Sequence, residues 1–353
     1  MAPRFQDLEF HSCHTFCLIH LYFLIMRNKS IYASISVLPM LLISCYHEVD
    51  MDSYRDEDGE NLLTLNSLVT PDSTVQVMAT RTYFFSDIHN DRTYVKGLDI
   101  DIIVNSEKKE GMTYDTERNL YISDVKVGPG DEVGLHTTFM DKTITASDIM
   151  PHSVSIEDVT VSRQGPVSIY TNSDFVFTYR VTFTDPIGDG DYYFLQWDAV
   201  DPRKDIMMGE RDFTHELVFQ QLANQVHATL PGWEPYSPYG LPFSDKGIDG
   251  ERYTLTVKEI VQMPKGSFQW NLTQMKRRFR LHAISKAYYD YLVSALMNRT
   301  NDKGLQGGMI DLGIADPVKV YSNISGGVGI LGCYTTAESE IDALKIVGPF
   351  PKQ

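Results

Sequence analysis

The sequence predicts a mainly β fold with two β-sandwich-like domains and one amphipathic helix in the second domain. Apolar residues alternate with other residues along short stretches, most clearly along 175–183, and this period of two is typical of half-buried antiparallel strands. Turn signals such as Gly-Pro-Gly-Asp at 128–131 separate these stretches. One segment, 285–299, has helical spacing instead. Repeated short strands joined by such turns favour sandwiches.

The strand pattern recurs on both sides of a predicted domain boundary. Apolar residues also alternate along 98–104 and along 253–257, so we expect a strand in each. Between them, a strand led by Pro151 gives way to Arg163-Gln164-Gly165-Pro166. Gly-Pro is a turn signal, so the boundary is predicted near 159–167.

Two domains and one helix follow from this order of elements. The first is an N-terminal β-sandwich domain at 61–162, and the second is a C-terminal β-rich domain at 163–353. Ser285 is a candidate N-cap for the helix at 285–299 in the second domain. The helix carries apolar residues at helical spacing, namely Tyr288, Leu292, Ala295 and Leu296.

The segment from Met26 to Cys45 reads as a bacterial lipoprotein signal peptide. Arg27 and Lys29 provide the positive start, and 31–43 is an apolar stretch without charge. This stretch is too short to remain as a transmembrane helix, and it ends in a small-residue cleavage site before Cys45. We therefore expect signal peptide 26–44 to be removed and Cys45 to carry several acyl chains, such as palmitate, which together anchor stably.

The residues around this signal receive separate interpretations. Residues 1–25 precede a segment that belongs at an N-terminus, so we interpret them as a non-native upstream extension with Met26 as the initiator. Their Cys13 and Cys17 lack a second ligand pair at zinc-site spacing, so no metal is expected there. Residues 45–60 are acidic and poor in aliphatic side chains, which is typical of a flexible tether.

Composition excludes several classes of partner. The chain has 31 basic and 47 acidic residues and a formal net charge of −16. Phosphates would repel such a chain, so we expect no nucleic-acid binding. Adsorption to anionic lipid is disfavoured for the same reason, and we expect the N-terminal lipid to hold the protein at the membrane. After processing, the cysteines are Cys45 and Cys333, so no intrachain disulfide is expected.

Two motifs resemble ligand sites, and each has a simpler structural interpretation. The run from Gly327 to Gly332 matches G-x-G-x-x-G, but the residues after it favour a strand where a dinucleotide site needs a helix. Tight turns or close backbone contacts explain the glycines better. Asp185, Asp189 and Asp191 lie in a Gly-rich turn, but they do not have EF-hand spacing, so a solvated turn is favoured over calcium.

The loop 231–243 is the candidate recognition surface. It combines four prolines with the aromatic residues Trp233, Tyr236 and Tyr239. Stiff loops that present aromatic side chains bind partners or stack on sugars. The alternative is a lid packed on its own domain, in which case the same aromatic residues are core residues.

The C-terminal run from Ala315 to Gly332 resembles the closing motif of a Bacteroidetes outer-membrane lipoprotein family, domain of unknown function 4249 (DUF4249). Its Ser322-Asn323-Ile324-Ser325-Gly326-Gly327 segment carries the resemblance. Weaker matches occur in the expected order at 68–73, 130–131, 143–151, 191–193, 243–245, 249–250 and 285–291. The resemblance implies an outer-membrane lipoprotein, often encoded with TonB-dependent receptors, and a first domain like the transthyretin or carboxypeptidase-regulatory sandwich.

Taken together, these observations predict a lipid-anchored accessory or binding protein of the cell envelope. We expect it on the outer membrane, at the periplasmic face or the cell surface, in association with a TonB-dependent nutrient-uptake receptor. Motifs of serine hydrolases, zinc proteases and P-loop proteins are absent from the sequence, so neither catalysis nor a cofactor is expected. The alternatives are a surface adhesive or structural module and a hydrolase with an unrecognised site.

Overall fold

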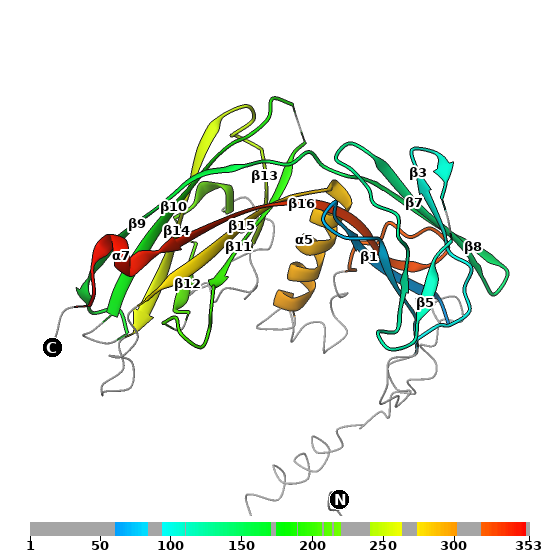
Figure 1. Cartoon of the computed structure of the whole chain (residues 1–353), viewed down its shortest axis with the longest axis horizontal. Helices are drawn as coiled ribbons and strands as arrows, with labels where there is room; N and C mark the ends of the chain where they lie inside the picture. The colour runs from blue at the N-terminus through cyan, green and yellow to red at the C-terminus, as the bar shows by residue number, and fades with distance from the viewer. Residues whose placement is uncertain are drawn as a thin grey trace, which may run out of the picture. The chain divides into compact units, whose positions relative to one another are not determined.

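The computed structural model describes residues 61–83, 94–109, 111–170, 174–188, 190–206, 208–213, 215–219, 241–262, 274–301 and 319–350. Within this part of the chain, strands dominate and two hydrophobic cores lie between β-sheets (Figure 1). The mainly β, sandwich-like fold predicted from the sequence is confirmed. The closer likeness of the first domain to transthyretin-type sandwiches stays a prediction.

The first core lies between one half of an eight-stranded sheet and a separate four-stranded sheet. On the eight-stranded side, the strands are β1 (Leu63–Val69), β2 (Gln76–Arg81), β6 (Leu120–Ile122) and β5 (Thr113–Asp115). On the other side, they are β4 (Glu107–Lys108), β3 (Asp101–Val104), β7 (Glu132–Phe139) and β8 (Lys142–Ile149). Alternation explains the layers, because Ile102 and Val104 are buried while Asp101 and Ile103 are half-buried.

The second core has the same layered construction. The eight-stranded sheet continues through β16 (Val328–Asp342), β15 (Lys276–Ile284), β11 (Tyr192–Ala199) and β13 (Leu241–Ser244). Opposite it lies a sheet of β9 (Ile156–Val167), β10 (Asp174–Thr184), β14 (Arg252–Gln262) and β12 (Glu210–Asp212). The alternation predicted along 175–183 is confirmed, because its apolar residues at every second position are all buried in this core.

Strand β16 belongs to both cores. Its first half pairs in parallel with β1, from Thr64 with Val328 to Val69 with Cys333, and its second half pairs antiparallel with β15 (Figure 1). Leu331 lies in the first core and Ile341 in the second. Strand β9 crosses the predicted boundary near 159–167 and contributes Val161 to the second core. The division at 162/163 stays a prediction.

Helix α5 (Lys286–Asn301) corresponds to the predicted helix at 285–299. Ser285 caps it, because the Ser285 hydroxyl accepts a hydrogen bond from the amide of Tyr288 at 3.2 Å. The helix packs against β16, β13 and β11, with Val293 buried. The structure adds a short helix that the sequence did not predict, α7 (Ala343–Val347), directly after β16. Among the described residues, no helix is long and apolar enough to cross a membrane.

A fully buried ion pair connects the two sheets of the second core. Arg277 on β15 and Glu259 on β14 are both completely buried, and the guanidinium donates two hydrogen bonds to the carboxylate at 2.8 and 2.9 Å. Arg277 also donates to the carbonyl of Ile206, and Tyr179 donates to Glu259. Removing one partner of such a pair leaves an uncompensated buried charge, which costs about 3–5 kcal/mol.

Candidate functional site

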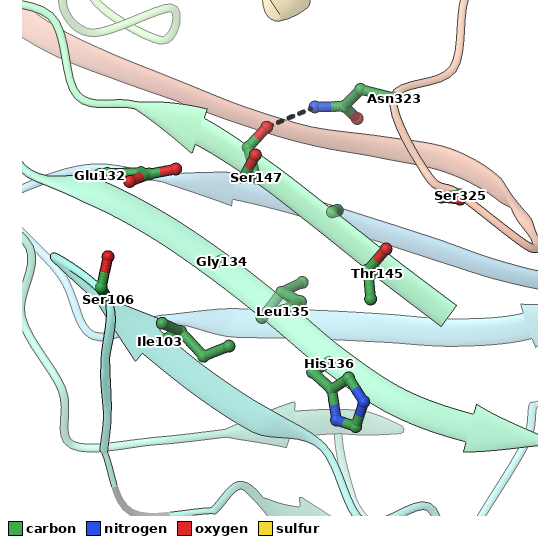
Figure 2. A pocket seen from close by; sticks show the side chains of 11 residues that line it. Ile103, Ser106, Glu132, Gly134, Leu135, His136, Thr145, Ser147, Asn323 and Ser325 are labelled. Atoms are coloured by element: carbon green, nitrogen blue, oxygen red, sulfur yellow. Dashed lines mark hydrogen bonds between the residues drawn. The ribbon is translucent and has the colours of Figure 1, made fainter. Parts of the chain in front are cut away.

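A hollow on the outer face of the β4–β3–β7–β8 sheet is the best-formed candidate site. It encloses about 370 Å³ and is open to solvent (Figure 2). Strands β3, β7 and β8 form its base, and the segment 323–325 forms one wall. Its lining consists of Ile103, Ser106, Glu132, Gly134, Leu135, His136, Thr145, Ala146, Ser147, Asn323 and Ser325.

The hollow exists because a glycine occupies the middle of the sheet. Ile103, Gly134 and Ser147 lie side by side across β3, β7 and β8. Gly134 is buried and has no side chain to fill the space above the sheet. Figure 2 shows Glu132 and His136 on either side of it along β7. An added Cβ at Gly134 would lie 3.4 Å from the Cβ of Ile103, so a larger residue would occupy part of the hollow.

The wall is held in place by the closing motif of the chain. Ser325 exchanges two backbone hydrogen bonds with Thr145, at 2.8 and 3.1 Å. Asn323 donates to the carbonyl of Leu331 at 2.8 Å and accepts from the amide of Leu331 at 2.9 Å. Its amide therefore occupies the place that a strand partner would take beside Leu331. Asn323 also donates to the carbonyl of Ser147 (Figure 2).

The charges around the hollow are unevenly paired. Asp101 lies 2.8 Å from the ammonium of Lys108 and 3.7 Å from Nδ1 of His136. The carboxylate of Glu132 is exposed, and within the described part of the chain no hydrogen bond or ion pair engages it. The hollow thus presents a carboxylate at one end of its β7 base and an imidazole at the other.

A second hollow, of about 410 Å³, lies where β8, the 190–191 turn and the start of α5 meet. Burial raises the pKa of Asp148, whose carboxylate accepts a hydrogen bond from the backbone amide of Cys333 at 2.8 Å. Burial, followed by the charges of Asp185, Asp245 and Asp249, raises the pKa of Asp191. The thiol of Cys333 is buried, and burial raises its pKa far above the ordinary value, so it is inert as a nucleophile.

The acidic turn identified in the sequence gathers carboxylates that the sequence pattern missed. Asp185 lies close to Asp245 and Asp249, whereas Asp189 falls outside the described residues. Asp245 accepts hydrogen bonds from the backbone amides of Gly190 and Asp191, at 2.8 and 2.9 Å. Asp185 accepts one from the amide of Gly250, and Asp249 accepts one from the amide of Gly188. These bonds hold the 185–191 and 245–250 turns together, but Asp185 and Asp245 are buried, so the expectation of a solvated turn is wrong for Asp185.

Most residues singled out from the sequence lie elsewhere. Cys45, Trp233, Tyr236 and Tyr239 are outside the described residues, as are the predicted extension 1–25, signal peptide 26–44 and tether 45–60. Phe243, the last residue of the aromatic loop, is described. It is buried at 1% exposure and packs against Phe183, Tyr193 and Phe219. This end of the loop therefore belongs to the second core.

The G-x-G-x-x-G run at 327–332 leads into β16, which begins at Val328, and the interpretation of close backbone contacts is confirmed. A Cβ at Gly329, where φ is +119°, would lie 2.0 Å from the carbonyl oxygen of Leu65. A Cβ at Gly327 would lie 2.5 Å from that of Leu63. These glycines let β16 approach β1, and the run continues as strand where a dinucleotide fold would begin a helix.

Sequence reasoning overlooked the residues around the first hollow. The available signal was Gly134, an isolated glycine inside the strand-like stretch EVGLHTT. Such a glycine indicates a bulge or a close approach of another group. The contribution of Asn323 and Ser325 had no local signal, because these residues reach the hollow from a segment far along the chain.

Comparison with known proteins identifies a family. A family model described as "Domain of unknown function (DUF4249)" matches residues 47–340. One similar solved structure is described as "Crystal structure of Putative membrane anchored protein from Corynebacterium diphtheriae". It is 9% identical with a TM-score of 0.19, and the match covers 64% of this chain and 55% of that chain. The comparison with curated proteins finds no match.

Proposed function

The chain belongs to the family described as "Domain of unknown function (DUF4249)", and we propose that it is a lipid-anchored accessory or binding protein of the cell envelope. The observation that carries the proposal is the signal at 26–45. In it, positively charged residues, an apolar stretch and a cysteine occur in the order that lipidation requires. The family match begins at residue 47, two residues after this cysteine. Cys45 is the proposed lipidated residue.

The proposed location is the outer membrane, and the proposed partner is a TonB-dependent nutrient-uptake receptor. The predicted tether 45–60 is acidic, which favours a folded body that is held near an anionic membrane surface without adsorbing to it. A tether of this length has a root-mean-square span of roughly 20–25 Å. That span keeps the folded body within reach of another protein in the same membrane.

Lipidation is tested by changing the cysteine. Cys45→Ala should leave the precursor uncleaved at this site and unlabelled by radioactive palmitate. Cys333→Ala is the matched control, because Cys333 is buried within the fold, and this variant should be processed and labelled like the wild type. Normal palmitate labelling of the Cys45 variant would refute the assignment.

Partnership is tested by purifying the tagged lipoprotein from its native membrane in mild detergent. We expect a TonB-dependent receptor to accompany the wild-type protein and to be absent when the Cys45→Ala variant is purified in the same way. Recovery of the wild-type lipoprotein without any outer-membrane receptor would contradict the proposed partner. It would leave the lipid anchor to be judged by the labelling experiment.

A further inference from the structure

Unused hydrogen-bonding groups surround the hollow on the β3–β7–β8 face. Within the described part of the chain, no hydrogen bond engages the Glu132 carboxylate or the hydroxyls of Ser106, Thr145 and Ser147. A hydroxyl both donates and accepts, whereas a carboxylate only accepts. Ile103 and the methyl group of Thr145 add apolar carbon to the same lining (Figure 2). The lining therefore offers both hydrogen-bond donors and hydrogen-bond acceptors, together with some apolar carbon.

Several ligand classes fit this lining poorly. An anion would meet Glu132 and the nearby Asp101, and the ammonium of Lys108 is already bonded to Asp101. Glu132 and His136 lie four residues apart on one strand, which separates them by about 13 Å. One metal ion cannot contact both at bonding distances of about 2.0–2.6 Å.

Apolar and strand-like ligands are also disfavoured. A purely apolar ligand would leave the surrounding hydroxyls and the carboxylate desolvated without partners. A peptide that adds a strand needs an unpaired sheet edge. The adjacent edge of β8 is already occupied, because Thr145 forms a bridge with Ser325.

We propose that this hollow binds a neutral saccharide. Sugar hydroxyls donate to Glu132 and both donate to and accept from Ser147 and Thr145, while the C–H face of a ring covers Ile103. The distance of about 13 Å between Glu132 and His136 suits a short chain of linked rings lying along β7. This site is independent of the lipid anchor and of the receptor proposed above.

The test is calorimetric titration of the full-length protein, purified in a detergent without a sugar headgroup. The probes are neutral trisaccharides of differing linkage, namely maltotriose, cellotriose, xylotriose, mannotriose and chitotriose. We expect the wild type to bind at least one of them. The double variant Glu132→Gln with Ser147→Ala loses a charge-assisted hydrogen bond and a neutral one, so it should bind at least about tenfold more weakly.

A second variant and a matched control separate loss of the site from loss of the fold. Ser147→Phe fills the hollow from an exposed position and should abolish binding without changing the melting temperature appreciably. The control pair is Glu117→Gln with Ser162→Ala, which makes the same chemical changes at exposed positions away from the hollow. It should bind like the wild type.

Three results would overturn the assignment. These are no binding of any probe by the wild type, equal binding by wild type and Ser147→Phe, and equal weakening in the Glu117/Ser162 control. A fourth result would also overturn it, namely stronger binding of galacturonate trimers than of every neutral trisaccharide, because the ligand would then be anionic. None of these outcomes bears on palmitate labelling of Cys45, so the two proposals fail separately.

Discussion

His282 is a buried side chain whose ring is held by residues of the two strands that flank its own in the eight-stranded sheet. It lies on β15, is 8% exposed, and its ring nitrogens contact Thr336 at 2.8 Å and Gln196 at 2.9 Å. Its ring also stacks on Phe194. Burial, followed by the nearby charge of Arg280, lowers the pKa of His282 to about 4. The imidazole is therefore neutral in the folded protein at neutral pH.

This lowered pKa predicts a loss of stability in mild acid. The unfolded chain binds a proton at His282 near pH 6.5, whereas the folded chain binds it only near pH 4. As pH falls from 6.5 to 4, this group alone should therefore lower the free energy of unfolding by up to about 3 kcal/mol. His282→Gln keeps hydrogen-bonding capacity but does not titrate, so its free energy of unfolding should fall less over this range.

Urea denaturation at several pH values between 4 and 7.5 measures the effect. His215→Gln is the control, because the side chain of His215 is 66% exposed, and this variant should follow the wild-type curve. Parallel curves for the wild type and His282→Gln would show that the imidazole is protonated equally in both states.

Among elements, β16 shows most clearly what the sequence could and could not predict. Alternation along 175–183 and 253–257 predicted strands that are found as β10 and β14, because each pattern depends only on neighbouring residues. The glycines of 326–332 indicated close contacts, but not with which strand. Parallel pairing with β1 joins distant parts of the chain, and no local period encodes it.

The candidate hollow was unpredictable for the same reason. Gly134, at the base of the hollow, lies in a stretch whose sequence pattern indicates a strand. The wall of the hollow, by contrast, is held by the bridge between Thr145 and Ser325, which are far apart in the sequence. The bonds that Asn323 makes to Leu331 also depend on how the closing segment folds back on itself. Such side-chain contacts follow from tertiary packing, so residue type and spacing alone did not reveal them.

The contact between β16 and β1 predicts a large cost for a small substitution. Gly329→Ala places a methyl group 2.0 Å from the Leu65 carbonyl oxygen, at a φ of +119°. It should lower the free energy of unfolding by at least about 2 kcal/mol, as measured by urea denaturation. Added NAD or ATP should leave the melting temperature of the wild type unchanged.

Gly190→Ala provides the matched comparison. Gly190 also has a positive φ, of +105°, but a Cβ there would meet nothing within 4 Å. The substitution should cost only the backbone strain, about 1–2 kcal/mol. If both variants lose the same stability, steric contact with β1 is not the reason for glycine at 329. A rise in melting temperature with nucleotide would restore the dinucleotide interpretation.

At the scale of the whole molecule, the aromatic loop 231–243 is the predicted contact with a partner. Its prolines restrict the backbone, so ordering the loop on binding should cost little entropy. Trp233→Ala together with Tyr236→Ala should weaken co-purification of the receptor while leaving the melting temperature unchanged. Phe243 is excluded from the test because it is buried in the second core.

The two alternatives for this loop give different results. If the double variant melts at a much lower temperature, its aromatic residues are core residues and the lid interpretation holds. If it folds normally and recovers the receptor in full, recognition takes place on another surface.

Strand β16 also determines when the protein can fold. The ribosome makes β1 well before β16, yet the first core combines Leu65 and Val69 from β1 with Leu331 and Cys333 from β16. Such long-range pairing forms late, after the intervening chain has emerged. The first core therefore cannot close until β16 has been made. Any pathway that exports the protein as an unfolded chain would have the interval between synthesis of β1 and synthesis of β16 in which to engage it.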